Sequence, residues 1–147
     1  MPKPPPDGRF QTAPVVALLE QAGVSKLASI RVAGPGALAV VLGLRRHDYD
    51  QAGCVCAGEG SPHEEPDVVL VAQPCGELDL KRLLSVGRQV RPGGAFIFQL
   101  KAGPGASLTA VEWLLQHAGF TLERHLGSSR GALILARRRA FAPRQAA

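Results

Sequence analysis

Hydrophobic and polar positions follow two different patterns along this chain, and their order predicts helices and strands in alternation. Val15, Leu18, Leu19 and Ala22 repeat at the three- or four-residue spacing of a helix with one buried face. By contrast, the run Asp67-Val-Val-Leu-Val-Ala-Gln73 is almost uninterruptedly apolar, which is typical of a strand buried on both faces. Segments of both kinds recur along the chain, so the pattern predicts an α/β fold.

The connections between these segments are short and indicate how they join. Pro92-Gly93-Gly94 separates a helical segment from an apolar strand, because proline cannot continue a helix and glycine takes the positive φ of a tight turn. Residues 127–131 are too few for a right-handed crossover, so we expect the last two strands to be antiparallel. The predicted helices are 15–22, 37–47, 78–90 and 107–117, and the predicted strands are 29–33, 53–57, 67–73, 96–100, 120–126 and 132–138.

Together the elements predict one domain over residues 13–139, with a sheet of about six mostly parallel strands that ends in an antiparallel hairpin. Residues 1–12 are rich in proline and predict a flexible segment, and residues 140–147 predict a flexible basic tail. No apolar run is long enough to span a bilayer, and the start of the chain lacks the apolar segment of a signal peptide. We therefore expect a soluble, cytoplasmic protein with no membrane partner.

The net charge of +5 comes from the carboxyl end of the chain. Residues 1–129 hold equal numbers of basic and acidic side chains, whereas residues 130–147 hold five arginines and no acid. The triplet Arg137, Arg138 and Arg139 predicts a solvated strand end or, alternatively, a surface that binds phosphates. Nucleic acid is therefore one candidate partner.

The three cysteines do not predict a disulfide framework, because their number is odd and two of them lie in an apolar strand segment. Cys54 and Cys56 are two residues apart, so both point to the same face of a strand. They are interpreted as small buried thiols. A zinc site would need further ligands, for which His63 and Cys75 are the only nearby candidates.

Several motifs in a fixed order resemble the class I S-adenosylmethionine-dependent methyltransferases. Gly34-Pro35-Gly36 follows the first predicted strand, Val90-Arg-Pro-Gly-Gly-Ala-Phe-Ile-Phe98 precedes and enters the fourth, and Ala118-Gly-Phe-Thr-Leu122 enters the fifth. The resemblance covers roughly residues 13–139 and implies a Rossmann-like, three-layer fold. It also implies a reversed last strand, in agreement with the predicted hairpin.

The resemblance implies a cofactor site made by Gly34, Pro35, Gly36, Glu59 and Gln73. In the family the first strand ends in an acidic-x-Gly-x-Gly pattern, whose glycines let the backbone approach the cofactor. Aligning Gly34 and Gly36 on the last two glycines of the motif puts Ile30 at the acidic position and Val32 at the first glycine, so half of the loop is missing. Glu59 matches the acid that binds the ribose hydroxyls, and Gln73 stands where many members carry a polar substrate-binding residue.

A full family member also inserts a helix and a strand between the second and third strands of this chain. Only residues 60–66 are available for that connection, which is too short to supply them. We therefore favour a non-catalytic, methyltransferase-like interaction or scaffold module with no cofactor, similar to the amino-terminal domains of the anamorsin family. The alternative is a compact methyltransferase that binds S-adenosylmethionine, completed by a partner chain.

Loss of the outer strand leaves the predicted strand 53–57 at an edge of the sheet. Unpaired backbone groups at such an edge can accept a strand from another chain. We therefore expect a protein partner or a homodimer at this edge, near Cys54 to Ala57.

Overall fold

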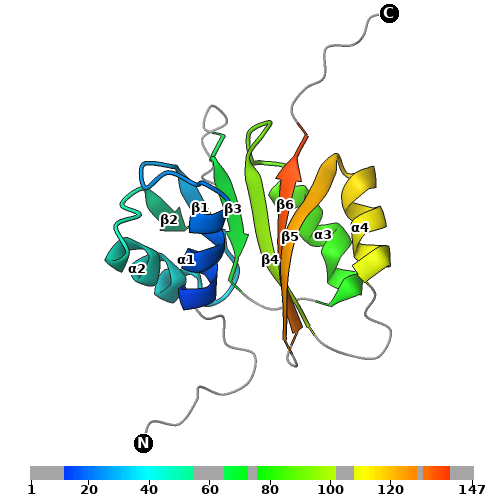
Figure 1. Ribbon diagram of the computed structural model, residues 1–147, viewed down its shortest axis with the longest axis horizontal. Coiled ribbons are helices and arrows are strands. Elements are labelled where there is room, and N and C mark those ends of the chain that lie inside the picture. The colour runs from blue at the N-terminus through cyan, green and yellow to red at the C-terminus, as the bar shows by residue number, and fades with distance from the viewer. Residues whose placement is uncertain (1–11, 55–64, 73–75, 102–107, 129–130, 140–147) are drawn as a thin grey trace, which may run out of the picture.

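A six-stranded sheet with helices on both faces forms the described part of the chain (Figure 1). The computed structural model describes residues 12–54, 65–72, 76–101, 108–128 and 131–139. The helices are α1 (Thr12–Gln21), α2 (Ala37–Arg46), α3 (Glu77–Gly87) and α4 (Leu108–His117), and the strands are β1 (Ile30–Ala33), β2 (Ala52–Cys54), β3 (Val68–Val71), β4 (Ala95–Lys101), β5 (Phe120–Ser128) and β6 (Gly131–Arg138).

The strands lie in the order β2-β1-β3-β4-β6-β5. Strands β2, β1, β3 and β4 pair in parallel, whereas β6 runs antiparallel to both β4 and β5. The predicted α/β class, the six mostly parallel strands and the antiparallel hairpin at the end are therefore confirmed. Residues 55–57 of the predicted second strand lie outside the described residues.

Two apolar layers fill the space between the sheet and its helices, one on each face. Helices α1 and α2 cover one face, where Leu18, Leu19 and Leu44 are fully buried against β1 and β3. Helices α3 and α4 cover the other face, which contains the buried phenylalanines of the core. There the ring of Phe96 lies 5.0 Å from that of Phe98 and 5.7 Å from that of Phe120. Strand β3 lies between both layers and is buried along its whole length, as its apolar run predicts.

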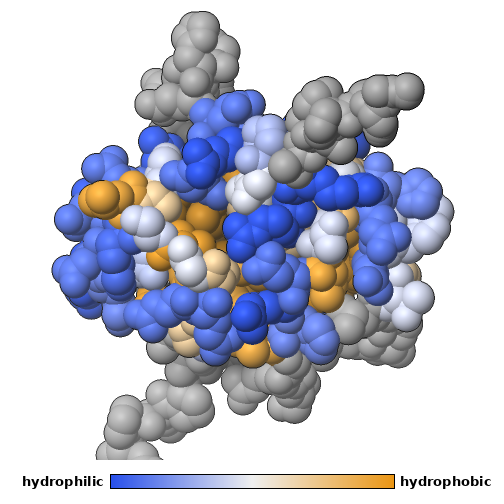
Figure 2. All heavy atoms as spheres, turned by 45° about the horizontal axis from the view of Figure 1, so that its top comes forward, coloured by the Kyte–Doolittle hydropathy of each residue, from blue (hydrophilic) through white to orange (hydrophobic). Residues whose placement is uncertain are grey.

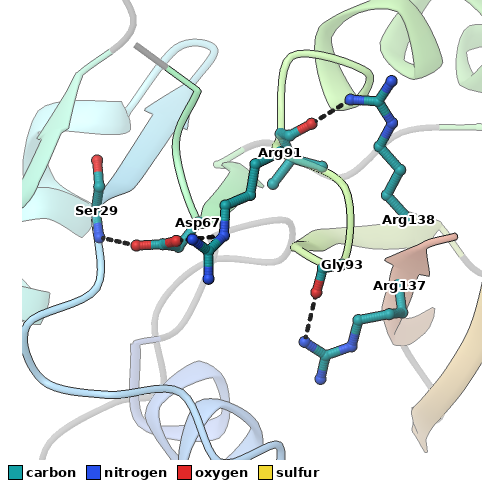
Figure 3. A network of polar contacts seen from close by, with 7 residues as sticks. Ser29, Asp67, Arg91, Gly93, Arg137 and Arg138 are labelled. Carbon is teal, nitrogen blue, oxygen red and sulfur yellow. Dashed lines mark hydrogen bonds and ion pairs between the residues drawn. The ribbon is translucent and has the colours of Figure 1, made fainter. Parts of the chain in front are cut away.

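An aspartate ties together three segments at the amino edge of the sheet, the top of Figure 1. The backbone N–H of Ser29 donates to Asp67 Oδ2 at 2.9 Å, and the Arg91 guanidinium lies 2.7 Å from Asp67 Oδ1 (Figure 3). The same carboxylate therefore contacts the start of β1 and the connection between α3 and β4. The hydrogen bond from Ser29 aligns the first residues of β1 and β3, and the ion pair with Arg91 uses the other oxygen of the same carboxylate.

The three arginines at and just after the end of β6 all donate hydrogen bonds within the protein. Arg137 forms a two-bond ion pair with Glu123 of β5, at 2.9 and 3.0 Å, and also donates to the carbonyl of Gly93 at 3.2 Å (Figure 3). Arg138 donates to the carbonyls of Arg88 and Val90, which follow α3, and Arg139 donates to the carbonyl of Gln116 at the end of α4. The last carbonyls of a helix lack intrahelical partners and carry its negative dipole end, so arginines stabilise them.

Cys54 packs against the apolar layer under α1 and α2 but is half-buried, less than the buried thiol that the sequence predicts. Cys56, Cys75 and His63 lie outside the described residues. In the described part of the chain, no group of three potential metal-ligating side chains comes together. None of the helices described there is both long and apolar enough to cross a membrane.

We expect Gly94→Ala to destabilise the fold by about 1–3 kcal/mol, because the turn before β4 has no room for a side chain. A Cβ at this position would lie 2.6 Å from the carbonyl oxygen of Asp67 and 2.6 Å from Val90 Cγ2. Urea unfolding of the two variants Gly94→Ala and Gly53→Ala tests this, since a Cβ at Gly53 would meet only Arg31, at an ordinary 3.5 Å. Equal midpoints for the two variants would contradict the prediction.

The ion pair between Glu123 and Arg137 predicts a pH-dependent contribution to stability. The hydrogen bond from Arg137 lowers the pKa of Glu123 from its ordinary value, although partial burial opposes the shift. A carboxyl group whose pKa is lowered in the folded state stabilises the protein above its unfolded pKa, and this contribution is lost as the pH falls through the folded value.

The free energy of unfolding of Glu123→Gln should therefore differ most from that of the wild type near neutral pH, and the difference should shrink in the acid range. Denaturant titrations between neutral and acid pH measure it. Glu112→Gln is the control, because this exposed glutamate of α4 has no described ion pair. A difference for Glu123→Gln that does not change with pH would contradict the assignment.

Candidate functional site

The chain reverses its direction of winding between β1 and β3, and this position marks the candidate site. From β1 the chain goes outward to β2, and from there it crosses back to β3 on the other side of β1. Ligands of open α/β sheets bind at such a switch point, beyond the carboxyl ends of the strands. Here that place is the connection from β1 to α2, which contains three of the predicted site residues.

Gly34, Pro35 and Gly36 form this connection, and all three are exposed. Gly34 has φ 97° and Gly36 has φ 85°, a left-handed conformation that side chains disfavour. The N–H of Ala37 donates to the carbonyl of Gly34 at 3.1 Å, so the turn closes directly onto α2. The sequence therefore places glycine at the two positions where the backbone geometry requires it.

The surroundings of the two glycines differ. A Cβ on Gly34 would lie 3.9 Å from the backbone nitrogen of Ala72, at the end of β3, whereas a Cβ on Gly36 would meet nothing within 4 Å among the described residues. Gly34 is thus held against the neighbouring strand, whereas none of the described residues blocks the approach of a ligand to the backbone of Gly36.

Helix α2 starts at this turn and offers donors to a ligand. Gly36 is its N-cap residue and provides no side-chain hydrogen bond. The N–H groups of Leu38 and Ala39 in the first turn have no described acceptor. Free N–H groups and the positive end of the helix dipole favour an acceptor oxygen or a negative group.

The bounds of β1 allow two alignments of the acidic position. The strand runs to Ala33, so Gly34 is the first residue after it. If Gly34 and Gly36 are the last two glycines of the motif, Ile30 stands at the acidic position, and if they are the first two, Val32 stands there. Both residues are apolar and fully buried, so neither alignment supplies the acid.

The other predicted site residues cannot be placed. Glu59 and Gln73 lie outside the described residues, so the structure brings together only Gly34, Pro35 and Gly36. Lys101, the exposed last residue of β4, lies at the same edge of the sheet and was not predicted from the sequence. An apolar run defines the end of a strand only to within a residue or two, so the sequence does not fix Lys101 at the end of β4.

Comparison with solved structures decides the fold family. The chain is similar to the ribosomal protein L11 methylase of Lactobacillus delbrueckii subsp. bulgaricus, with a TM-score of 0.64, 12% identity, and coverage of 88% of this chain and 79% of the other. The chain has the fold of a class I S-adenosylmethionine-dependent methyltransferase. This agrees with the resemblance seen in the sequence motifs.

Two further structures give the same result. A putative RNA methyltransferase from Pyrococcus horikoshii matches with a TM-score of 0.65, 10% identity and coverage of 90% and 83% of the two chains. The magnesium protoporphyrin IX methyltransferase of Synechocystis, solved with bound S-adenosylmethionine, matches with a TM-score of 0.55, 15% identity and coverage of 86% and 77%. No family model and no curated protein sequence matches the chain. At these identities the likeness concerns the fold.

Proposed function

We propose that this domain binds S-adenosylmethionine at the β1–α2 turn and acts as a compact methyltransferase. The observation that carries the proposal is the turn itself, where Gly34 and Gly36 both have positive φ, are exposed and lie at the switch point of the sheet. The similar structures are methyltransferases, one of them with S-adenosylmethionine bound, and this supports the choice of cofactor.

The residues of the chain would bind and orient rather than perform acid–base chemistry. S-adenosylmethionine supplies an activated methyl group on a sulfonium. Gly34 and Gly36 let the backbone approach the cofactor without a Cβ in the way, and the first turn of α2 provides N–H donors. Because methyl transfer depends mainly on the position of the acceptor relative to the methyl group, the site does not need a strong general base.

The missing acid sets an expectation for the affinity. A hydrogen bond to a charged group contributes about 1.5–3 kcal/mol. Without a carboxylate at Ile30 or Val32, the amino group of the cofactor loses one such partner. Since about 1.4 kcal/mol corresponds to a factor of ten, we expect binding about ten- to a hundredfold weaker than with the acid present.

Calorimetric titration with S-adenosylmethionine and with S-adenosylhomocysteine tests the proposal. We expect saturable binding of both, which Gly36→Val abolishes because a branched side chain would be strained at this φ and would fill the approach to the turn. Gly23→Val is a matched control, since Gly23 is also exposed, has φ 76° and has nothing within 4 Å of its Cβ position. No binding by the wild type, or equal loss in both variants, would contradict the proposal.

A non-catalytic interaction module is the second candidate, and the apolar residue in place of the acid favours it. Its expected interface is the edge of the sheet at β2, for which the structure gives a new detail. The N–H of Ile30 donates to the carbonyl of Gln51, so in this parallel register the N–H and carbonyl of Ala52 point away from β1. Both groups are already used within the protein.

The N–H of Ala52 donates to the carbonyl of Tyr49 at 3.3 Å, and the Arg45 guanidinium donates twice to the carbonyl of Ala52, at 3.1 and 2.9 Å. These contacts protect the start of the edge strand from pairing with another chain. An added strand would therefore have to pair from Cys54 onward, toward the predicted Cys54 to Ala57 interface.

Light scattering after size-exclusion chromatography tests this interface. If the edge forms a homodimer, Cys54→Pro should give a monomer, because the register points the N–H of Cys54 outward and proline removes it. Cys54→Ser keeps the N–H and should stay dimeric. A monomeric wild type, or two variants that behave alike, would contradict the homodimer.

A further inference from the structure

Among the described residues, arginines without an ion-pair partner gather where α3 and α4 end, on the edge of the sheet opposite to the cofactor site. Asp67 and Glu123, the two carboxylates of the polar network there, are each paired with an arginine, Arg91 or Arg137. In the described part of the chain, Arg88, Arg138 and Arg139 have no acidic partner. Arg138 and Arg139 instead donate to neutral backbone carbonyls.

These carbonyl contacts fix the positions of the two charges without neutralising them. Arg138 donates through Nη1 to the carbonyls of Arg88 and Val90, and Arg139 donates through Nη2 to that of Gln116. A guanidinium has five N–H donors, so each arginine keeps donors for a ligand. Arg88 is exposed beside them. Figure 2 shows that hydrophilic residues cover most of this side of the molecule.

An exposed aromatic pair lies on the last turns of α4, the helix whose carboxyl end Arg139 binds. The side chain of Trp113 is 56% exposed, and its ring lies against that of His117, with centroids 3.8 Å apart and the planes tilted by 33°. The His117 ring is held in place by Nδ1, which donates to the carbonyl of Trp113 at 3.1 Å. Gln116, whose carbonyl Arg139 binds, lies between them in sequence, so the aromatic pair and the arginine share one turn of helix.

We propose that this surface, made by Arg88, Arg138, Arg139, Trp113 and His117, binds single-stranded nucleic acid. A flat, exposed ring accepts an unpaired base by stacking, and fixed guanidinium groups beside it bind the phosphates of the same strand. An acidic protein would use the charges but would have no specific use for the exposed ring, whereas a lipid surface could use both, so anionic vesicles are the comparison that matters. The proposal does not depend on cofactor binding, because the surface lies at the opposite end of the strands.

The chain has one tryptophan, so selectively excited tryptophan fluorescence reports on this surface alone. On titration with an oligoadenylate of about twelve nucleotides, we expect quenching of Trp113 and an affinity that falls steeply with salt. Vesicles containing anionic lipid are the comparison probe. Binding without quenching, or binding of the vesicles but not of the oligonucleotide, would overturn the proposal.

Variants separate stacking from charge, with anisotropy of a labelled oligoadenylate as the measurement. Trp113→Ala should weaken binding about tenfold, and Trp113→Phe should restore most of it, because phenylalanine also stacks. Arg88→Gln should weaken binding and reduce the slope of log affinity against log salt by about 0.7. Arg46→Gln removes an equally exposed charge from α2 and is the matched control.

Equal effects of Arg88→Gln and Arg46→Gln would mean that only the net charge matters, and would overturn the proposed surface. So would an unchanged affinity in Trp113→Ala. Titration of the same variants with S-adenosylmethionine keeps the two proposals apart, because these substitutions should leave cofactor binding unchanged.

Discussion

The pairing of β1 with β3 is the constraint on which the rest of the structure depends. At its amino end the carbonyl of Ser29 accepts hydrogen bonds from the N–H groups of Asp67 and Val68. The carboxylate of Asp67 in turn accepts a hydrogen bond from the N–H of Ser29. At its carboxyl end the N–H of Ala72 donates to the carbonyl of Ala33 at 2.8 Å. Both ends of the pair are thus fixed, and the glycine turn that follows Ala33 is held beside the end of β3. Without this pairing there would be no switch point and no place for a ligand.

Most of the fold could be predicted from the sequence because its signals are local. The buried run of β3, the helical spacing of α1 and the Pro92-Gly93-Gly94 turn each depend on neighbouring residues only, and the structure agrees with all three. The contacts of Arg138 were not predictable in this way. Its partners, Arg88 and Val90, lie 50 and 48 residues away, and nothing in a triplet of arginines indicates that one pairs with an acid and two with helix ends.

The candidate site was predictable only in part, for a related reason. Two glycines separated by proline after an apolar strand indicate a tight turn, and Gly34 and Gly36 have the positive φ that this requires. The position of the acid is less well defined, because an apolar strand does not mark its own last residue. With β1 ending at Ala33, either Ile30 or Val32 can stand at the acidic position, and both are apolar and buried.

The positions of the charges make the two proposed binding surfaces, the glycine turn and the arginine-rich edge, electrostatically independent of one another. The seven residues of β4 separate the carboxyl edge from the amino edge by about 20 Å, more than a Debye length in physiological salt. The arginines at the ends of α3 and α4 therefore contribute little to the potential at the glycine turn. A positively charged sulfonium bound there would not be repelled by them. At their own edge they stabilise helix carboxyl termini, whose partial negative charge makes the accumulation of guanidinium groups favourable. The polarity of the helices thus places cations at one edge and N–H donors at the other. This polarity follows directly from the parallel winding of the sheet.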